Sequence, residues 1–408
     1  LYFATQALSL KPTDPRGHLN LGCALSVMGR VDDAHYCFET VLKLSPNNVS
    51  ALTNIAVAQE KRGEIDAAIA SLDRAQRLSP KGSEQEARIF YSKSYPLLSK
   101  GMLKEGWAMY AYGFKPNSKL GRAPKRKFKV PQWTGESILN KKLLIWREQG
   151  IGDELMFSHI IPETFPFCND IIIECEERLV SLFQRSFSNC LVRMQYFDVL
   201  SGFAKTEDYD YHIPMGSLTA LFRNDIESFQ RGKPYLIPDS TQVEDFAHRL
   251  ATYKHKKLVG ICWRSGVVNA DRSLYYAPLS SWKPIFDVEN TVFVNLQYGD
   301  CAQELQQAHE ILGVEILGWS DLDLRNDLEG LAALMANLDC VISVGTAVAQ
   351  MAGALGKHLM LLTPRGWTLF GQNYYPWFGN TDLFVAEVNE SVEFLIPRVA
   401  QRLEALTQ

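Results

Sequence analysis

The sequence predicts α-helical repeats followed by an α/β part built of two doubly wound domains with parallel sheets. Three observations lead to this prediction. Small residues and prolines recur near the N-terminus with a spacing of 34 residues. After about residue 140, short aliphatic runs alternate with helical patterns, which is typical of parallel strands covered on both faces. Residues 232–239, rich in Gly and Pro, then divide the second part into two halves, each of the size of one such domain.

The repeats come first along the chain. Pro12, Pro46 and Pro80 lie 34 residues apart, and Gly29 and Gly63 share this period. Small residues at such positions let two antiparallel helices approach closely, and the proline ends the second helix of each pair. The pattern resembles the tetratricopeptide repeat, which has this period.

A weaker third unit is expected to follow, with Gly101 and Gly106 in comparable places. The repeats are therefore expected to occupy residues 1–114. Residues 115–140 hold Lys, Arg, Pro and Gly with little periodicity and are interpreted as a linker. The basic stretch Lys125–Lys129 is interpreted as a solvated part of that linker. The sequence opens without Met inside a helical pattern, so a further N-terminal piece is expected to precede it.

The α/β part is expected to consist of an N-terminal Rossmann-like half, 141–235, and a C-terminal half, 236–408, that ends in a helix. Ligands of such folds bind beyond the carboxyl ends of the strands, so ligand-binding residues are expected in the loops that follow the strands. The expected strands are Leu143–Trp146, Ile171–Cys175, Leu258–Trp263, Val292–Gln297, Val341–Val344 and Leu359–Leu362.

The loop after the first strand carries two carboxylates, Glu148 and Asp153. Gly150 and Gly152 allow a tight turn there, and a helix is expected to begin near Asp153. A carboxylate at this place faces a ligand cleft from a rigid strand end and suits general base chemistry. The alternative is that Asp153 only caps the helix.

Two loops of the C-terminal half offer groups for an anion. Arg264, with Arg272 after it, suits two-pronged binding of phosphate or carboxylate, and the alternative is a structural ion pair. Gly345, Thr346 and Ala347 lie where a strand ends and a helix with small residues begins. The free N–H groups of such a helix start attract phosphate, and the alternative is a plain turn.

A last loop brings Arg365 and Trp367 next to an aromatic run, Tyr374–Trp377. Aromatic rings beside a strand end could stack on a base or a sugar, or belong to the core. Two Asp-X-Asp sequences, Asp208–Asp210 and Asp321–Asp323, match a short metal-binding pattern of low specificity. No other ligands accompany them, so no metal site is expected.

The composition argues against several classes of protein. The net charge of −4 gives no basis for nucleic-acid binding, and no apolar run approaches the roughly 20 residues that a membrane span requires. No signal peptide opens the sequence. The eight Cys are scattered without a Cys-X-X-Cys motif, which favours buried thiols in a reducing compartment and hence the cytoplasm.

Several motifs together resemble the heptosyltransferase-like and O-GlcNAc-transferase-like glycosyltransferases of the two-Rossmann (GT-B) type. The combination with repeats is similar to bacterial protein glycosyltransferases, including those that modify flagellin. The matching segments are Gly150–Leu155, Gly260–Gly266, Val294–Asp300, Asp327–Gly356 and Tyr374–Phe378.

The resemblance implies a nucleotide-sugar donor bound between the two halves, without a metal or further cofactor. Asp153 is the expected general base for the acceptor hydroxyl, and Glu148 is the second choice. The residues expected to bind the donor are Arg264, Ser265, Gly266, Arg272, Gln297, Tyr298, Gly345, Thr346, Ala347, Gln350, Arg365 and Trp367.

One departure from the family pattern bears on the donor. Heptosyltransferase-like members carry Asp-Thr and a later His at the third motif, where this sequence has Gly345, Thr346 and Gln350. This form is similar to the flagellin-modifying branch, whose donors are CMP-activated nonulosonic acids. We therefore expect a metal-independent inverting enzyme that moves such a sugar to Ser or Thr of a protein like flagellin, held by the repeats.

Two alternatives remain open from the sequence. The protein could act on a polysaccharide or a lipid-linked glycan with a UDP or ADP sugar, the repeats then serving assembly. It could also be a catalytically inactive scaffold that keeps the fold and binds partners only.

Overall fold

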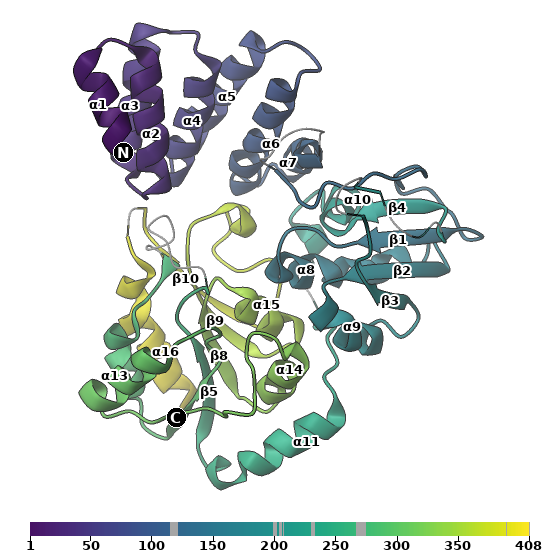
Figure 1. Cartoon of the computed structure of the whole chain (residues 1–408). Helices are drawn as coiled ribbons and strands as arrows, with labels where there is room; N and C mark the ends of the chain where they lie inside the picture. Colours follow the sequence, from purple (N-terminus) through teal and green to yellow (C-terminus); the bar gives the residue numbers. More distant parts are fainter. Residues whose placement is uncertain are drawn as a thin grey trace.

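The computed structural model describes residues 1–114, 121–198, 202–203, 206, 208–229, 233–266, 275–388 and 390–407. The helical repeats form one layer of the molecule, and two α/β halves lie below them with their sheets side by side (Figure 1). The α/β halves follow the repeats in the chain, as the sequence predicted. The fold is therefore a helical repeat segment joined to a GT-B-type pair of Rossmann-like domains.

Antiparallel helix pairs build the repeat segment. Gly22 of the first pair faces Phe38, and a Cβ on Gly22 would lie 2.5 Å from the Phe38 ring. This contact explains why a residue without a side chain stands opposite Phe38. Asn48 begins one helix by accepting a hydrogen bond from the N–H of Ala51 at 2.9 Å. The helices are α1 (Tyr2–Leu10), α2 (Pro15–Val27), α3 (Val31–Leu44), α4 (Val49–Lys61), α5 (Ile65–Leu78), α6 (Glu84–Ser99) and α7 (Leu103–Tyr110).

The expected third unit is present as the pair α6 and α7. Its turn residue Gly101 has a φ of +80°, like the turn residues Gly29 and Gly63 at +73°. A Cβ on Gly106 would lie 2.6 Å from the Leu98 side chain, so this glycine also permits a close helix approach. The pair differs from the others because Leu98 and other buried residues of α6 and α7 belong to the same hydrophobic cluster as the α/β halves.

The N-terminal half contains, among its described residues, a four-stranded sheet in the order β3-β2-β1-β4. All three pairings are parallel, and β1 lies between β2 and β4 with Trp146 opposite Glu174 and Pro214. The chain order of the strands reverses at β1, which is where such sheets bind ligands. The elements are β1 (Lys142–Trp146), α8 (Ile151–Phe157), β2 (Asp170–Cys175), α9 (Val180–Ser186), β3 (Leu191–Met194), β4 (Tyr211–Pro214) and α10 (Leu218–Phe222).

The C-terminal half contains a parallel sheet, six-stranded in its described part, in the order β10-β9-β8-β5-β6-β7. The order reverses at β5 and β8. The loop with Arg264 follows the carboxyl end of β5, and the loop with Gly345 and Thr346 follows that of β8. The elements are α11 (Ser240–Arg249), β5 (Lys257–Cys262), α12 (Lys283–Phe286), β6 (Thr291–Asn295), α13 (Ala302–Leu312), β7 (Ile316–Leu317), α14 (Leu328–Ala336), β8 (Cys340–Val344), α15 (Ala347–Ala354), β9 (His358–Pro364), β10 (Thr381–Ala386) and α16 (Ile396–Thr407).

The segment interpreted as a linker, 115–140, is part of the folded core where it is described. Trp133 is buried, and its indole N–H donates to the backbone oxygen of Glu136 at 2.7 Å. The basic stretch is not wholly solvated either, because the guanidinium of Arg126 is fully buried and pairs with Glu174 at 2.7 Å. The interpretation of the basic stretch as solvated was wrong for Arg126. The sequence alone does not show that Glu174, on strand β2, lies beside it and pairs with its charge.

The described part of the segment between the two halves, residues 233–239, is extended and packs on α15. The N–H groups of Tyr235 and Leu236 donate to the backbone oxygen of Ala354 at 2.9 and 3.1 Å. Across the described residues, no helix combines the length and the apolar character that crossing a membrane would require.

Candidate active site

A cavity of about 720 Å³ lies where the carboxyl ends of the two sheets meet the repeats. All three parts of the chain contribute to its wall. The repeats contribute α4, and the N-terminal half contributes the start of α8 and the loop after β2. The C-terminal half contributes α14 and the loops after β5, β6, β7, β8 and β9. The residues of the wall are Lys61, Gly150, Ile151, Gly152, Asp153, Met156, Arg178, Ser265, Tyr275, Tyr276, Tyr298, Leu324, Arg325, Leu328, Leu331, Val344, Gly345, Thr346, Ala347, Val348, Gln350, Met351, Leu361, Thr363, Pro364, Arg365, Gly366, Trp367, Thr368 and Tyr375.

Asp153 lies on this wall in the first turn of α8, which begins at Ile151 rather than at Asp153 as the sequence suggested. Its Oδ2 accepts a hydrogen bond from the N–H of Gly150 at 3.1 Å. Burial raises the pKa of Asp153 to about 6, the N–H of Gly150 opposes this shift, and the charge of Glu148 adds to it. The carboxyl group is therefore ionised at neutral pH and can accept a proton there.

The starts of α8 and α15 meet across the cavity. A Cβ built on Gly152 would lie 3.6 Å from the Cα of Ala347 and 3.8 Å from the Cγ of Gln350. Gly152 thus brings the Asp153 turn of one half against the third motif of the other half. A ligand held by the start of α15 would lie within reach of the Asp153 turn.

The third motif presents backbone N–H groups to the cavity. Thr346 is the N-cap residue of α15, has an extended backbone and is buried. Its hydroxyl lies 3.3 Å from the Ser343 hydroxyl. The amide of Gln350 both donates to and accepts from the Tyr375 hydroxyl, at 2.8 and 3.1 Å. The helix dipole and the free N–H groups at this point favour an anionic group.

Glu148, the second candidate for the base, lies away from the cavity wall. Its carboxylate is buried and forms an ion pair with the buried guanidinium of Arg122. It also accepts a hydrogen bond from the N–H of Gly216 at 2.7 Å. These bonds occupy the carboxylate oxygens, so the structure argues against Glu148 as a base and gives it a structural role.

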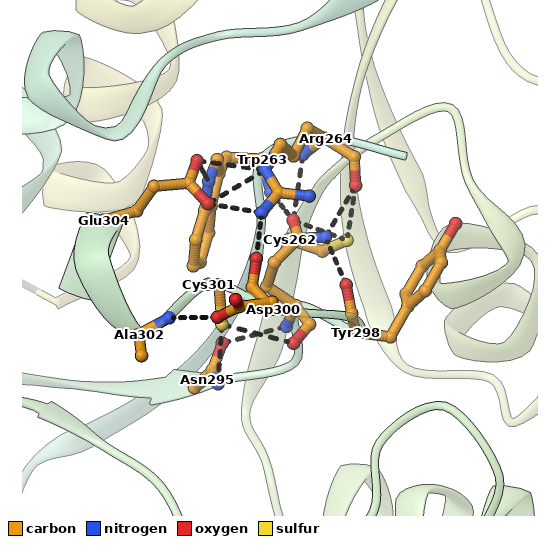
Figure 2. A network of polar contacts seen from close by, with 10 residues as sticks. Cys262, Trp263, Arg264, Asn295, Tyr298, Asp300, Cys301, Ala302 and Glu304 are labelled. Carbon is orange, nitrogen blue, oxygen red and sulfur yellow. Dashed lines mark hydrogen bonds and ion pairs between the residues drawn. The ribbon is translucent and has the colours of Figure 1, made fainter. Parts of the chain in front are cut away.

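Arg264 is also engaged elsewhere, as Figure 2 shows. Its Nε lies 2.9 Å from both carboxylate oxygens of Glu304, and its Nη2 donates to the backbone oxygen of Asp300 at 2.7 Å. The indole N–H of Trp263 binds the same carboxylate at 2.8 Å (Figure 2). The structural ion pair, the alternative considered from the sequence, is what the structure contains, and Arg264 is not on the cavity wall.

Gln297 holds the loop after β5 instead of lining the cavity. Its Oε1 accepts from the N–H groups of Trp263 and Arg264 at 3.1 and 3.0 Å, and its Nε2 donates to the Arg264 backbone oxygen at 2.9 Å. Gln297 is among the residues that line a smaller neighbouring pocket of about 340 Å³. The contribution of Gln297 to the larger cavity is therefore to shape the loop that carries Ser265.

The other predicted site residues lie on the cavity wall, except for Gly266 and for Arg272, whose position is not described. Gly266 is not among the wall residues, and a Cβ on it would lie 2.8 Å from the ring of Tyr298. Arg272 lies outside the described residues. The predicted residues on the wall are Asp153, Ser265, Tyr298, Gly345, Thr346, Ala347, Gln350, Arg365 and Trp367.

The sequence interpretation missed three cations of the wall: Lys61, Arg178 and Arg325. Arg178 follows the predicted strand β2, so its place after a strand end was a usable signal. Arg325 precedes α14 and has no such signal. Lys61 belongs to the repeats, where the period gives no indication of which helix end faces the α/β halves.

The two Asp-X-Asp sequences lie outside the cavity. Asp208 pairs with Arg193 at 2.7 Å, and Asp321 pairs with Arg249 at 2.8 Å. In the part of the chain that the structure describes, no cluster of three or more His, Cys, Asp or Glu side chains could hold a metal ion.

Comparison with known proteins gives a sequence family for the repeats and a curated relative for most of the chain. Residues 19–83 match the sequence family "Tetratricopeptide repeat". The chain carries tetratricopeptide repeats. Protein FlbA of Caulobacter vibrioides is 34% identical to this chain over 397 residues, which are 94% of this chain and 66% of FlbA. The chain thus spans just under two thirds of the length of this curated relative.

Among solved structures, the similar ones include three glycosyltransferases, all at low sequence identity. The family 9 glycosyltransferase of Veillonella parvula is 11% identical, with 65% of this chain and 92% of that chain covered and a TM-score of 0.44. The heptosyltransferase WaaC of E. coli with ADP is 15% identical, with 65% of this chain and 99% of that chain covered and a TM-score of 0.40. An O-GlcNAc transferase of Thermobaculum terrenum is 12% identical, with 98% of this chain and 87% of that chain covered and a TM-score of 0.32.

Proposed function

We propose that the protein is a glycosyltransferase that moves a sugar from a nucleotide donor to a Ser or Thr hydroxyl of an acceptor protein. The observation that carries this proposal is the position of Asp153, whose carboxylate lines the cavity at the point where α8 meets the start of α15. A base on one side and an anion site on the other side are the two elements that displacement of a sugar from phosphate requires.

In the proposed reaction the donor phosphate binds at Gly345, Thr346 and Ala347. The N–H groups and the dipole of α15 stabilise the negative charge that develops on the phosphate as the sugar leaves. Asp153 accepts the proton of the acceptor hydroxyl, whose oxygen attacks the anomeric carbon opposite the phosphate. The new bond therefore has inverted configuration at that carbon.

The donor we propose is a CMP-linked acidic sugar of the nonulosonic type. The third motif holds Gly345 and Gln350 in place of the acid and the imidazole of related heptosyltransferase-like sequences, and Gln350 is bound to Tyr375. Arg365 adds an exposed guanidinium to the cavity wall. A site with few acidic groups and added cations suits a ligand that carries both a phosphate and a carboxylate.

The acceptor we propose is a protein like flagellin, held by the repeats. Tetratricopeptide repeats form extended concave surfaces suited to a polypeptide segment. Binding there raises the effective concentration of the acceptor hydroxyl at the cavity. The similarity of the sequence to flagellin-modifying glycosyltransferases supports this choice.

Calorimetric titration with CMP, UDP, GDP and ADP tests the donor class. We expect CMP to bind at least about tenfold more tightly than the other three, which corresponds to about 1.4 kcal/mol. Tighter binding of UDP or ADP would exclude the CMP donor and favour transfer from a neutral sugar. Weak and equal binding of all four nucleotides would contradict catalysis and leave a repeat scaffold.

A further inference from the structure

The aromatic run Tyr374–Trp377 packs into the interior of the molecule. The ring centroid of Trp377 lies 5.7 Å from that of Phe157 in α8, and its indole N–H donates to the backbone oxygen of Thr368 at 3.0 Å. Of the two alternatives considered from the sequence, a stacking surface and a core position, the buried rings of Tyr375 and Trp377 agree with the core. Tyr375 is the member of the run that also lines the cavity.

The next residue of the chain, Phe378, docks this run on α15. A Cβ on Gly353 of α15 would overlap the ring of Phe378, so the absence of a side chain at Gly353 permits this close approach. The run therefore contacts α8 through Trp377 and α15 through Phe378. These two contacts give Tyr375 a defined place near the junction of the two helices, where the Asp153 turn meets the start of α15.

The hydroxyl of Tyr375 holds the side chain of Gln350. The Nε2 of Gln350 donates to this hydroxyl at 2.8 Å, and the hydroxyl donates to the Oε1 of the same amide at 3.1 Å. Burial raises the pKa of Tyr375, the bond with Gln350 opposes this shift, and the charge of Asp153 adds to it. The hydroxyl therefore stays protonated at neutral pH and keeps a proton to donate to the amide oxygen.

The amide of Gln350 lies beside the start of α15. Gln350 is the fourth residue of this helix, and helical side chains lean toward the N-terminal end. A Cβ built on Gly152 would lie 3.8 Å from the Cγ of Gln350 and 3.6 Å from the Cα of Ala347, so one point adjoins both residues. The side chain thus lies next to the turn whose backbone N–H groups the proposed function assigns to the donor phosphate.

One N–H of this amide remains for a ligand. A carboxamide nitrogen carries two hydrogens, and the hydroxyl of Tyr375 accepts one of them. Within the residues that the structure describes, the second hydrogen has no protein acceptor, and Gln350 lines the cavity. A hydrogen bond to a charged phosphate oxygen is stronger than one between two neutral groups. The second N–H therefore adds a side-chain donor to the backbone donors at the start of α15.

We propose that Tyr375 is a positioning residue, which holds the amide of Gln350 so that its second N–H donates to the phosphate of the nucleotide donor. This inference rests on the proposed function, because it presumes a nucleotide sugar whose phosphate lies at the start of α15. The bond to Tyr375 selects one rotamer of Gln350 before the donor binds, and a group that is already oriented loses less conformational entropy on binding. Without the hydroxyl, the amide is expected to occupy several rotamers.

Calorimetry on the full chain with two probes, CMP and cytidine, isolates the contribution of the phosphate. Gln350→Met keeps the length of the side chain and removes the amide, whereas Tyr375→Phe keeps the ring and removes the hydroxyl. We expect Gln350→Met to bind CMP at least about tenfold more weakly than the wild type and cytidine within about twofold. Tyr375→Phe should weaken CMP binding at least about threefold with cytidine binding unchanged. In the double variant Tyr375→Phe should add no further loss, because its effect passes through Gln350.

Tyr235→Phe is the matched control for the loss of a tyrosine hydroxyl. The hydroxyl of Tyr235 donates to the backbone oxygen of Leu155 in α8 at 2.6 Å, and Tyr235 is not among the wall residues. This variant should be less stable in thermal unfolding and should bind both probes as the wild type does. Thermal unfolding of every other variant checks that the fold is preserved.

Each outcome decides the proposal. Unchanged CMP affinity of Tyr375→Phe would overturn the positioning role. Losses that add in the double variant would place the hydroxyl on the ligand itself and overturn that role as well, and equal losses for CMP and cytidine would contradict the contact with phosphate. A wild type that binds UDP but not CMP would overturn the proposed donor, and the same variants, titrated with UDP and uridine, would then decide the role of Tyr375. A wild type that binds no nucleotide would overturn the proposed function and this inference together.

Discussion

At the scale of single residues, the ionisation of Asp153 should determine how the activity depends on pH. Burial raises its pKa to about 6, so the carboxylate required of a base is lost as the pH falls through that value. We expect kcat/KM to rise with pH, with a midpoint near 6, and to level off above it. A midpoint near the ordinary value for Asp, about 3.9, would contradict the assignment.

Glu148 provides a contrasting prediction, because its buried pair with Arg122 has a structural role. Glu148→Gln leaves the guanidinium of Arg122 buried without a counter-charge. Loss of one partner of a buried pair costs about 3 kcal/mol or more in the free energy of unfolding, which urea denaturation measures. The matched control is Glu177→Gln, which replaces a glutamate that is not on the cavity wall. Unchanged stability together with lost turnover would return Glu148 to the list of catalytic residues.

The sequence alone distinguished only in part between residues that line the cavity and residues that form structural ion pairs. The places of Asp153 and Thr346 on the cavity wall could be predicted because each lies in the first loop or turn after a strand end. The roles of Glu148 and Arg264 could not, because their partners Arg122 and Glu304 are supplied by distant segments. A charged residue after a strand end predicts a place near the cleft, but the ion pair that removes it from the cleft depends on tertiary packing.

At the scale of elements, the last repeat helix supports the turn that carries Asp153. Gln149 has a φ of +58°, which is unfavourable for a side chain other than glycine. Its N–H donates to the backbone oxygen of Ala123 at 2.6 Å, and its side-chain amide donates to the hydroxyl of Tyr110 in α7. The repeat thus stabilises a strained backbone next to the proposed base.

Tyr110→Phe removes this hydroxyl and keeps the ring in place. Loss of the hydrogen bond should weaken the turn by about 1 to 2 kcal/mol. We expect faster hydrogen exchange in residues 147–154 and reduced turnover, with nucleotide affinity unchanged. Tyr36→Phe, on the exposed face of α3, is the control. Unaltered exchange in this segment would show that α7 does not hold the turn.

At the scale of the whole molecule, the repeats are not a separable module. Trp107 and Tyr110 of α7 are buried in the hydrophobic cluster that also contains Leu143 of β1 and Trp377. The indole N–H of Trp107 donates to the backbone oxygen of Arg223 at 2.9 Å. The boundary expected at residue 114 therefore separates α6 and α7 from a core that they help to form.

Two deletions test this shared core. Removal of residues 1–45, which hold α1 to α3, leaves that core complete. We expect this variant to bind CMP normally and to modify its acceptor more slowly, because part of the docking surface is lost. Removal of residues 1–114 should abolish folding, as judged by circular dichroism and CMP binding. A folded and fully binding product of the longer deletion would contradict the shared core.

The architecture was predictable from periodicity, because the 34-residue spacing and the aliphatic runs are local signals. Among the described strands that the sequence did not reveal, β4 at Tyr211–Pro214 and β7 at Ile316–Leu317 are short, whereas β10 at Thr381–Ala386 is as long as the strands that were predicted. The contact between the repeats and the C-terminal half was not predictable either. It depends on Gly63 and Gly101, whose turns signal a helix pair but not the surface that the pair rests on.

Mass spectrometry of the acceptor tests the central claim most directly. A flagellin acceptor is incubated with a CMP-linked nonulosonic acid and either the wild type or Asp153→Asn. The control is Asp170→Asn, which lies at the amino end of β2, away from the carboxyl ends of the strands. The wild type and Asp170→Asn should add the mass of the sugar to Ser or Thr, whereas Asp153→Asn should do so at least about 100-fold more slowly with CMP affinity preserved. Transfer by Asp153→Asn at the wild-type rate, or no transfer by the wild type, would contradict the account.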